Sequence, residues 1–214
     1  MSLHDESLGA LLEKLSAATP TPGGGSAAAF VGSVAASLVA MVAGLTIGKR
    51  AYQDVEQEMR TVLSEAIRLR DELLELADRD SEAFNAVMAA YRLPKETETD
   101  RAAREKAIQA ALRGATEVPY QTALRCFRVL ELAEIVTAKG NKNALSDGGA
   151  AACLAEGALQ AALLNVSINV AAISDEIFKS TYKQERERLS AQAHTKRSVI
   201  LQRIAERLGA ECPS

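Results

Sequence analysis

Apolar residues recur three and four positions apart along most of this chain, which is the spacing of an amphipathic helix. The longest such run covers residues 53–92 and stops at Leu93-Pro94, and a shorter one covers residues 7–17. No segment alternates apolar and polar residues with the two-residue period of a strand over any length. The pattern therefore predicts an all-α protein, folded as a helical bundle.

Local signals indicate where the later helices begin and end. Thr97 and Asp100 resemble a capping box at the start of the next helix. Pro119 is expected to interrupt or kink that helix, because proline lacks the N–H that a helix interior uses, and Lys139-Gly140 is expected to end it. Ser174 is expected to cap a last, highly charged helix that ends near Gly209.

Two helices of small, uncharged residues interrupt the amphipathic pattern. One lies within residues 26–48, and the other follows residues 140–149 and reaches about Ile173. A helix without a polar side is surrounded by neighbours, and small residues let those neighbours approach closely. We therefore expect a bundle built around two small-residue buried helices. If the two helices pack together, the loops at their N-termini could line one pocket, although the sequence leaves their arrangement open.

The loop before the first of these helices has the composition of a ligand-binding segment. Two prolines exclude helix, the glycines 23–25 let the backbone lie flat against a ligand, and Ser26 is expected to cap the helix that follows. Bare N–H groups at a helix N-terminus bind an anion or a carbonyl-rich ring.

Composition narrows the class of protein. The chain has 214 residues, 48% of them hydrophobic and 4% aromatic, which fits one domain over residues 1–214 with a core of Ala, Leu and Val. A net charge of −3 with interspersed acids and bases argues against a nucleic-acid partner. Three distant cysteines and the lack of a signal pattern in residues 1–10 favour a cytoplasmic location.

A membrane span is the competing interpretation of residues 26–48. The run is long enough to cross a bilayer, but it consists mostly of Ala, Gly, Ser and Val rather than the larger residues that drive insertion. We therefore expect a buried helix and no membrane.

Asp80 is the most informative polar residue. It continues the apolar stripe of the long helix beyond Leu76, and a carboxylate on that face needs a partner or a task. A structural ion pair or a cap for a neighbouring helix would explain it as well as catalysis would.

Other polar residues are open to two interpretations. Asn165 and Asn169 are four positions apart, spaced to bind one edge of a ligand, or else to bond a neighbouring helix. Asn141 and Asp147 lie in the second glycine-rich loop, where ordinary capping would explain either one alone.

Several chemistries can be set aside. The spacing of Gly23, Gly25 and Ala28 matches a relaxed dinucleotide fingerprint, but no strand precedes it, and no lysine completes a phosphate loop. His4 and His194 are the only histidines, so a histidine-based metal site or triad is not expected. Acid–base chemistry would come from carboxylates, lysines or ordered water, with no metal and no nucleotide.

The motifs together resemble the cyclodeaminase/cyclohydrolase family, which comprises the C-terminal half of formiminotransferase-cyclodeaminase and stand-alone methenyltetrahydrofolate cyclohydrolases. The resemblance covers residues 7–205. It rests on the segments 20–25 (PTPGGG), 49–52 (KRAY), 80–84 (DSEAF), 118–119 (VP), 140–143 (GNKN) with Ser146-Asp147, and 165–178 from Asn165 to Phe178. It implies an all-helical, dimer-forming domain that binds a tetrahydrofolate derivative without metal or nucleotide.

The resemblance also suggests roles for the residues singled out above. We assign Asp80 as the catalytic carboxylate and Asp147 as a second carboxylate or ring anchor. Lys49, Arg50 and Lys142 would pair with the glutamate carboxylates of the folate, although cations at a helix end are favourable in any case. The expected substrate-binding residues are Pro22, Gly23, Gly24, Gly25, Ser26, Lys49, Arg50, Asn141, Lys142, Asn165 and Asn169.

Because no formiminotransferase half is present in the chain, hydrolysis of 5,10-methenyltetrahydrofolate to 10-formyltetrahydrofolate is the expected reaction. Deamination of formimidoyltetrahydrofolate with release of ammonia is the alternative, since the shared motifs do not separate the two reactions. A non-catalytic folate-binding protein and a membrane-associated helical protein remain open as alternatives from other classes.

Overall fold

The computed structural model describes residues 2–209 and contains helices but no strand within that range, so the all-α prediction is confirmed. Cys212 lies outside the described residues. Three short 3-10 helices, η1 (Leu3–Asp5), η2 (Arg50–Val55) and η3 (Lys142–Ala144), accompany the α-helices. The α-helices are α1 (Leu8–Ser16), α2 (Gly24–Gly44), α3 (Glu56–Tyr91), α4 (Glu98–Lys139), α5 (Leu145–Ala171) and α6 (Glu176–Leu208).

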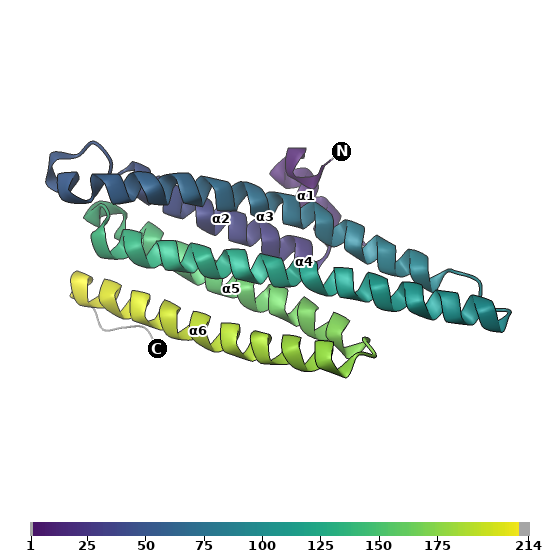
Figure 1. The fold of residues 1–214 in the computed structure, drawn as a ribbon. Helices are drawn as coiled ribbons and strands as arrows, with labels where there is room; N and C mark the ends of the chain where they lie inside the picture. Colours follow the sequence, from purple (N-terminus) through teal and green to yellow (C-terminus); the bar gives the residue numbers. More distant parts are fainter. Residues whose placement is uncertain (1, 210–214) are drawn as a thin grey trace.

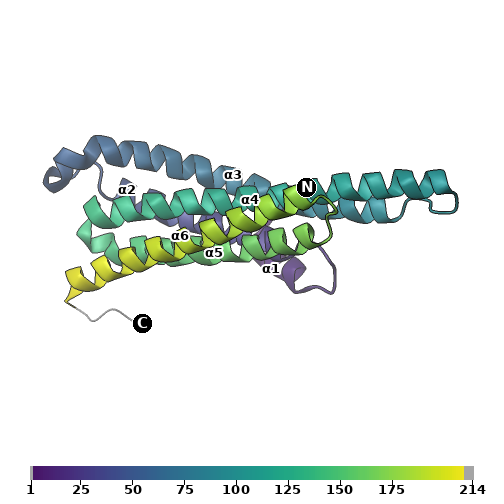
Figure 2. The same ribbon diagram turned by 60° about the horizontal axis from the view of Figure 1, so that its bottom comes forward.

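The five long helices form a bundle whose helices run side by side (Figure 1). The small-residue helices α2 and α5 pack against each other and against α3 and α4, and α6 lies along α5 and α4 (Figure 2). Small residues make this packing possible. A Cβ on Gly32 of α2 would lie 2.6 Å from the Sγ of Cys126, and a Cβ on Gly148 of α5 would lie 2.5 Å from Cγ2 of Thr137. The bundle is therefore built around two small-residue helices, but the expectation that neighbours surround each of them is wrong, since Val34 of α2 and Leu164 and Ile168 of α5 are exposed.

The helices α2 and α5 run in opposite directions. Gly24, at the start of α2, lies beside Asn165 near the end of α5. At the other end, Asn141 before α5 donates its Nδ2 to the Leu45 carbonyl over 3.0 Å. The two glycine-rich loops therefore lie at opposite ends of the bundle, and the expectation that they could line one pocket within a single chain is wrong.

The N-terminus of α2 and the start of α6 differ from the predicted caps. Gly23, which is extended, is the N-cap of α2, and Ser26 lies inside the first turn, where its hydroxyl is turned toward α3. Asp175 rather than Ser174 caps α6, because its carboxylate accepts from the N–H groups of Ile177 and Phe178. The capping box of Thr97 and Asp100 is confirmed.

Pro119 neither ends nor interrupts α4, which continues from Glu98 to Lys139. A proline at position 119 leaves the carbonyl of Ala115 without its usual helical donor. The side-chain Nδ2 of Asn169 on α5 fills that role, donating to this carbonyl over 2.6 Å. A neighbouring helix thus supplies the hydrogen bond that the proline removes.

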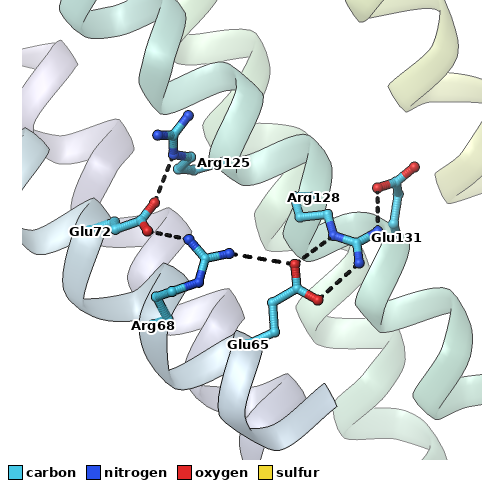
Figure 3. A network of polar contacts seen from close by, with 6 residues as sticks. All are labelled: Glu65, Arg68, Glu72, Arg125, Arg128 and Glu131. Atoms are coloured by element: carbon cyan, nitrogen blue, oxygen red, sulfur yellow. Dashed lines mark hydrogen bonds and ion pairs between the residues drawn. The ribbon is translucent and has the colours of Figure 1, made fainter. Parts of the chain in front are cut away.

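A network of charged side chains joins the solvent-facing sides of α3 and α4 (Figure 3). Arg128 donates Nε and Nη2 to the two carboxylate oxygens of Glu65 over 2.8 and 2.9 Å, and its Nη1 to Glu131 over 2.8 Å. Arg125 donates to Glu72 over 2.8 Å, and Arg68 bonds the same glutamate. The network ties α3 to α4 through partly exposed groups.

Beyond the bundle, the end of α3 and the start of α4 continue as a two-helix arm (Figure 1). The arm has a small apolar core of its own, to which Ile173 contributes from the segment before α6. The buried residues of this core are Val87, Ala90, Ile108, Leu112, Ala115 and Ile173.

Two stretches are apolar and long enough to cross a membrane by length and composition: Gly24–Gly44 and Lys142–Ala171. In the structure 50% and 44% of their most apolar windows are buried inside the bundle. The remaining residues of each window are partly or fully exposed.

Candidate functional site

The carboxylate of Asp80 lies at the N-terminus of α2. It accepts a hydrogen bond from the Oγ of Ser26 over 3.0 Å and another from the Ser26 backbone N–H. Since Gly23 offers no side chain as a cap, Asp80 on α3 caps the neighbouring helix instead. Of the structural alternatives for Asp80, the helix cap is therefore observed. No ion pair with Asp80 occurs among residues 2–209, so the alternative of a structural ion pair is not observed.

Glycine at position 25 is required by the closeness of this contact. A Cβ added to Gly25 would lie 2.1 Å from Oδ1 of Asp80 and 2.5 Å from its Cγ, which is well inside van der Waals contact. The third glycine of the loop therefore makes room for the carboxylate. This is the close approach for which glycine is chosen over any other residue.

Ser26 connects Asp80 to its surroundings. Its fully buried hydroxyl lies 2.9 Å from the Ala77 carbonyl, 3.0 Å from Asp80 Oδ2 and 3.3 Å from the Oγ of Ser81. Ser81 was not singled out from the sequence, because a serine on a charged helix carries no signal of its own. The three side chains form one hydrogen-bonded cluster at the helix end.

Opposing effects set the protonation of Asp80. Burial raises the pKa of its carboxyl above the ordinary value, and the two hydrogen bonds from Ser26 lower it by a smaller amount. The partial positive charge at the start of α2 also favours the ionised form. The result is a half-buried carboxylate that is more basic than an exposed aspartate and has no cation bonded to it.

A hollow of about 690 Å³ adjoins this cluster. The buried Pro22 and the half-buried Ser81 line it on the side of the cluster, and the loop residues Thr19 and Thr21 line another part. The N-terminal segment also lines the hollow, and it is held to α3 because the Leu3 N–H donates to Asp78 over 2.6 Å. The hollow gives the proline- and glycine-rich loop a concave surface beside Asp80.

The asparagines of α5 lie partly at this site. Gly24 is in van der Waals reach of Asn165, since a Cβ there would lie 3.7 Å from Nδ2, and that Nδ2 donates to the Ala161 carbonyl of its own helix. Asn169 bonds Ala115 on α4, so the interhelical role is observed for it. The Oδ1 atoms of both side chains accept no hydrogen bond from any residue in the described part of the chain.

The second loop and its cations lie at the far end of α2. Asn141 is buried and fully engaged, since its Oδ1 accepts from the Asn143 N–H over 3.1 Å and its N–H bonds Thr46. The capping alternative for Asn141 is therefore observed. Asp147 is half-buried in the first turn of α5. Lys142 is exposed, and its backbone N–H donates to Tyr52 over 3.0 Å, which places the neighbouring Lys49 and Arg50 at the same end.

The predicted site residues thus fall into two groups. The first group lies at the N-terminal end of α2 and comprises Pro22, Gly23, Gly24, Gly25, Ser26, Asp80 and Asn165. Asn169 lies one turn beyond Asn165 on α5. The second group lies at the other end of α2 and comprises Lys49, Arg50, Asn141, Lys142 and Asp147. A helix of the length of α2, 21 residues, separates them by about 30 Å. A single chain does not bring the two groups together.

A separate hollow of about 470 Å³ lies between α5 and α6. It is lined by Val166, Ser167 and Val170 of α5 and by Lys183 and Arg186 of α6. These α5 residues point away from the side of the helix that carries Asn165, as helical spacing requires. The hollow is therefore not part of the Asp80 site.

Known proteins resemble this chain over nearly its whole length. A family model described as formiminotransferase-cyclodeaminase matches residues 7–188. A methenyltetrahydrofolate cyclohydrolase of Methylorubrum extorquens is 44% identical over 189 residues, covering 88% of this chain and 91% of that protein. A formimidoyltransferase-cyclodeaminase of Gallus gallus is 34% identical over 94% of this chain, which spans only 37% of that longer protein.

The fold has a counterpart among solved structures. The crystal structure of a formiminotetrahydrofolate cyclodeaminase from Thermotoga maritima matches with a TM-score of 0.81 and 31% sequence identity. The match covers 97% of this chain and 98% of that one. Sequence and fold therefore agree on the same group of relatives.

Proposed function

Because the chain belongs to the formiminotransferase-cyclodeaminase family, we propose that it is a folate one-carbon enzyme that hydrolyses 5,10-methenyltetrahydrofolate to 10-formyltetrahydrofolate. The relative from Methylorubrum extorquens, which carries the name of this activity, is matched over 91% of its length. The longer cyclodeaminases are matched over little more than a third. The higher sequence identity to the hydrolase, 44% against 34%, favours this reaction.

The reaction needs a base and a negative charge near a delocalised cation. Water adds to the cationic methenyl carbon and gives up a proton, which forms a neutral tetrahedral adduct. The bond from this carbon to N5 then breaks, N5 takes up a proton, and the hydroxyl loses its proton as the formyl C=O forms. One proton is released overall.

Asp80 is suited to the role of base, and the observation that carries this proposal is its position at the α2 N-terminus without a bonded cation. A carboxylate whose pKa is raised by burial is a better base than an exposed one, and its negative charge favours the cationic substrate. Free N–H groups of the first turn and the side chain of Asn165 would hold the carbonyl edge of the pterin ring. Asp147 is the second carboxylate.

Deamination of formimidoyltetrahydrofolate is the second candidate, favoured by the match of 0.81 in TM-score to the enzyme from Thermotoga maritima. In this deamination an amine of the substrate attacks the formimino carbon, and ammonia leaves. The same carboxylate would serve both reactions.

We further propose a soluble, cytoplasmic homodimer that uses no metal and no nucleotide. Residues 2–209 hold no cluster of three or more His, Cys, Asp or Glu side chains suited to a metal. The half-exposed apolar helices α2 and α5 are better explained by a protein partner than by lipid, because each is buried along one side of the bundle.

The test is to mix the purified protein with 5,10-methenyltetrahydrofolate and follow the loss of its near-ultraviolet absorbance against a buffer blank. The formimidoyl compound is tested in parallel with ammonia as the readout. Faster loss of absorbance than in the blank supports the hydrolase, and release of ammonia alone supports the deaminase. Binding without turnover of either compound would make the chain a folate-binding protein.

A further inference from the structure

The hollow of about 470 Å³ between α5 and α6 takes no part in the proposed reaction. Small-molecule sites in proteins have volumes of about 300–1,000 Å³, so a ligand of modest size would fit it. The hollow lies on the other side of α5 from Asn165, whose side chain faces Gly24. We call it the α5/α6 hollow.

Part of the lining of the α5/α6 hollow is apolar and rigid. Val166 is buried, and Val170 and Tyr182 are half-buried. The Tyr182 ring is fixed by two other rings, since its centroid lies 4.5 Å from that of Phe178 and 5.1 Å from that of Tyr120. Its hydroxyl donates to a carboxylate of α4. A fixed ring beside two valines is a surface for a flat apolar group.

Cations line the same hollow on α6. Lys179, Lys183 and Arg186 are four and three positions apart, which places them on one face of the helix. Among the described residues that line the hollow, Glu176 is the sole acid, and it is bonded to Lys179 over 2.8 Å. Three cations against one acid leave the lining with a surplus of positive charge.

Two of these cations are available to a ligand. Lys183 is exposed and makes no ion pair within residues 2–209. Arg186 donates Nη1 to the Oγ of Ser167 over 3.2 Å, which holds its guanidinium against α5. Its Nη2 lies 3.6 Å from a carboxylate oxygen of Glu187, but an ion pair of that length between exposed groups contributes little. A ligand carboxylate could therefore bond Lys183 and Arg186 together.

This combination defines the chemistry of the ligand. Inorganic phosphate would satisfy the cations but leave the valines and the Tyr182 ring uncovered, and a neutral apolar molecule would leave the cations unused. The neighbouring hollow of about 690 Å³ shares Ser167 and Arg186, but it also contains Glu156 and Glu187, so acids outnumber the arginine there. Of the two hollows, the α5/α6 hollow is the one that favours an anion.

We propose that the α5/α6 hollow is a second ligand site, which binds an aromatic carboxylate and is separate from the hollow beside Asp80. The flat ring packs on the two valines and on Tyr182, and the carboxylate accepts hydrogen bonds from Lys183 and Arg186. This second site is independent of the reaction proposed above.

Two fluorescent probes of the same shape test the role of charge: 8-anilinonaphthalene-1-sulfonate and the uncharged N-phenyl-1-naphthylamine. The purified protein is expected to bind about one sulfonate probe per chain, with a Kd about tenfold or more below that of the neutral probe. Lys183→Glu should remove most of this difference, and Lys106→Glu, at an exposed position on α4, is the control. The carboxylate 1-naphthoate should displace the sulfonate probe.

Filling the hollow tests its position. Ala171 is exposed and lines the α5/α6 hollow, whereas Ala191 is exposed and lines the neighbouring hollow. Ala171→Trp should weaken binding of the sulfonate probe by about tenfold or more, because the indole ring occupies the space of the ligand. Ala191→Trp should leave the Kd unchanged. Thermal unfolding of each variant checks that it is folded.

Each of the following results would overturn the second site: equal affinity of the wild type for the two probes, failure of 1-naphthoate to displace the sulfonate, or a Kd for the sulfonate that neither Lys183→Glu nor Ala171→Trp changes. A probe held instead on the exposed apolar residues of α2 would give the last of these results. Weakening by Ala191→Trp as large as that by Ala171→Trp would also contradict the assigned position.

Discussion

The side-chain amide of Asn169 donates a 2.6 Å hydrogen bond to the carbonyl of Ala115, the acceptor that Pro119 deprives of its helical donor. Asn169→Ala leaves this carbonyl unpaired and should lower the free energy of unfolding by about 1–3 kcal/mol. In a Pro119→Ala background the residue at 119 supplies the N–H, so the same change should cost much less. A double-mutant cycle in denaturant measures the difference.

An equal cost in both backgrounds would contradict this structural role. A large rise in KM with little loss of stability would instead assign Asn169 to the substrate.

Asp80→Asn is expected to lower turnover by about a hundredfold or more, because the amide keeps the shape and the acceptor for Ser26 but cannot act as a base. Glu75→Gln, at an exposed position five residues earlier on α3, is the control. Near-normal turnover with a clearly lowered Tm would show that Asp80 is a structural cap only, and the catalytic role would pass to Asp147.

The difference in stability between the wild type and Asp80→Asn should depend on pH. Burial raises the folded-state pKa of Asp80 above its unfolded value, so this group favours folding below an unfolded pKa of about 3.9 and loses that contribution as the pH rises through the folded pKa. Asp80→Asn should therefore be as stable as the wild type or more stable at pH 7. Thermal unfolding should show the difference disappearing below about pH 4.

Gly25→Ala should destabilise the protein by about 1–3 kcal/mol and abolish turnover, since the new methyl carbon would lie 2.1 Å from Oδ1 of Asp80. Adding Asp80→Ala should restore most of the stability but none of the turnover. Gly114→Ala, in an open position on α4, is the control and should be neutral or stabilising. If the double variant is no more stable than Gly25→Ala, the crowding does not come from Asp80.

The pair formed by Glu65 and Arg128 should contribute modestly to stability, because both groups are partly exposed (Figure 3). Bonding from Arg128 lowers the pKa of Glu65, so its contribution is present above the unfolded pKa and is lost as the pH falls through the folded pKa. Glu65→Gln should cost at most about 1 kcal/mol at pH 7 in low salt and less in high salt. A salt-independent loss would point to packing rather than charge.

Turnover should survive exhaustive chelation and require no added nucleotide. Loss of activity with a chelator, restored by zinc, would contradict the assignment of the chemistry to carboxylates. The measurement is the same absorbance assay before and after chelation and gel filtration.

The helices themselves could be predicted from the sequence, because apolar spacing and the capping box of Thr97 and Asp100 depend only on neighbouring residues. The direction of α5 relative to α2 could not, since a helix of small residues looks alike from both ends. For the same reason the two glycine-rich loops could be identified but not placed. Continuity of α4 through Pro119 depends on Asn169, which is remote in sequence.

Within the site, the apolar stripe on α3 identified Asp80, because a carboxylate stands out among leucines. Its contact with Gly25 could not be predicted, as it depends on how closely α2 approaches α3. The participation of Ser81 was missed, and Ser26 was given the wrong position in its helix because Gly23, without a side chain, serves as the N-cap.

The two-helix arm affects how the protein behaves on a gel-filtration column. With 42 residues, α4 alone is about 63 Å long, whereas a compact chain of 214 residues has a radius of gyration of about 17 Å. A rod-like particle diffuses more slowly than a sphere of equal mass and elutes earlier. A single copy would therefore elute with an apparent mass above its true mass. The number of subunits must be measured by a method that does not depend on particle shape.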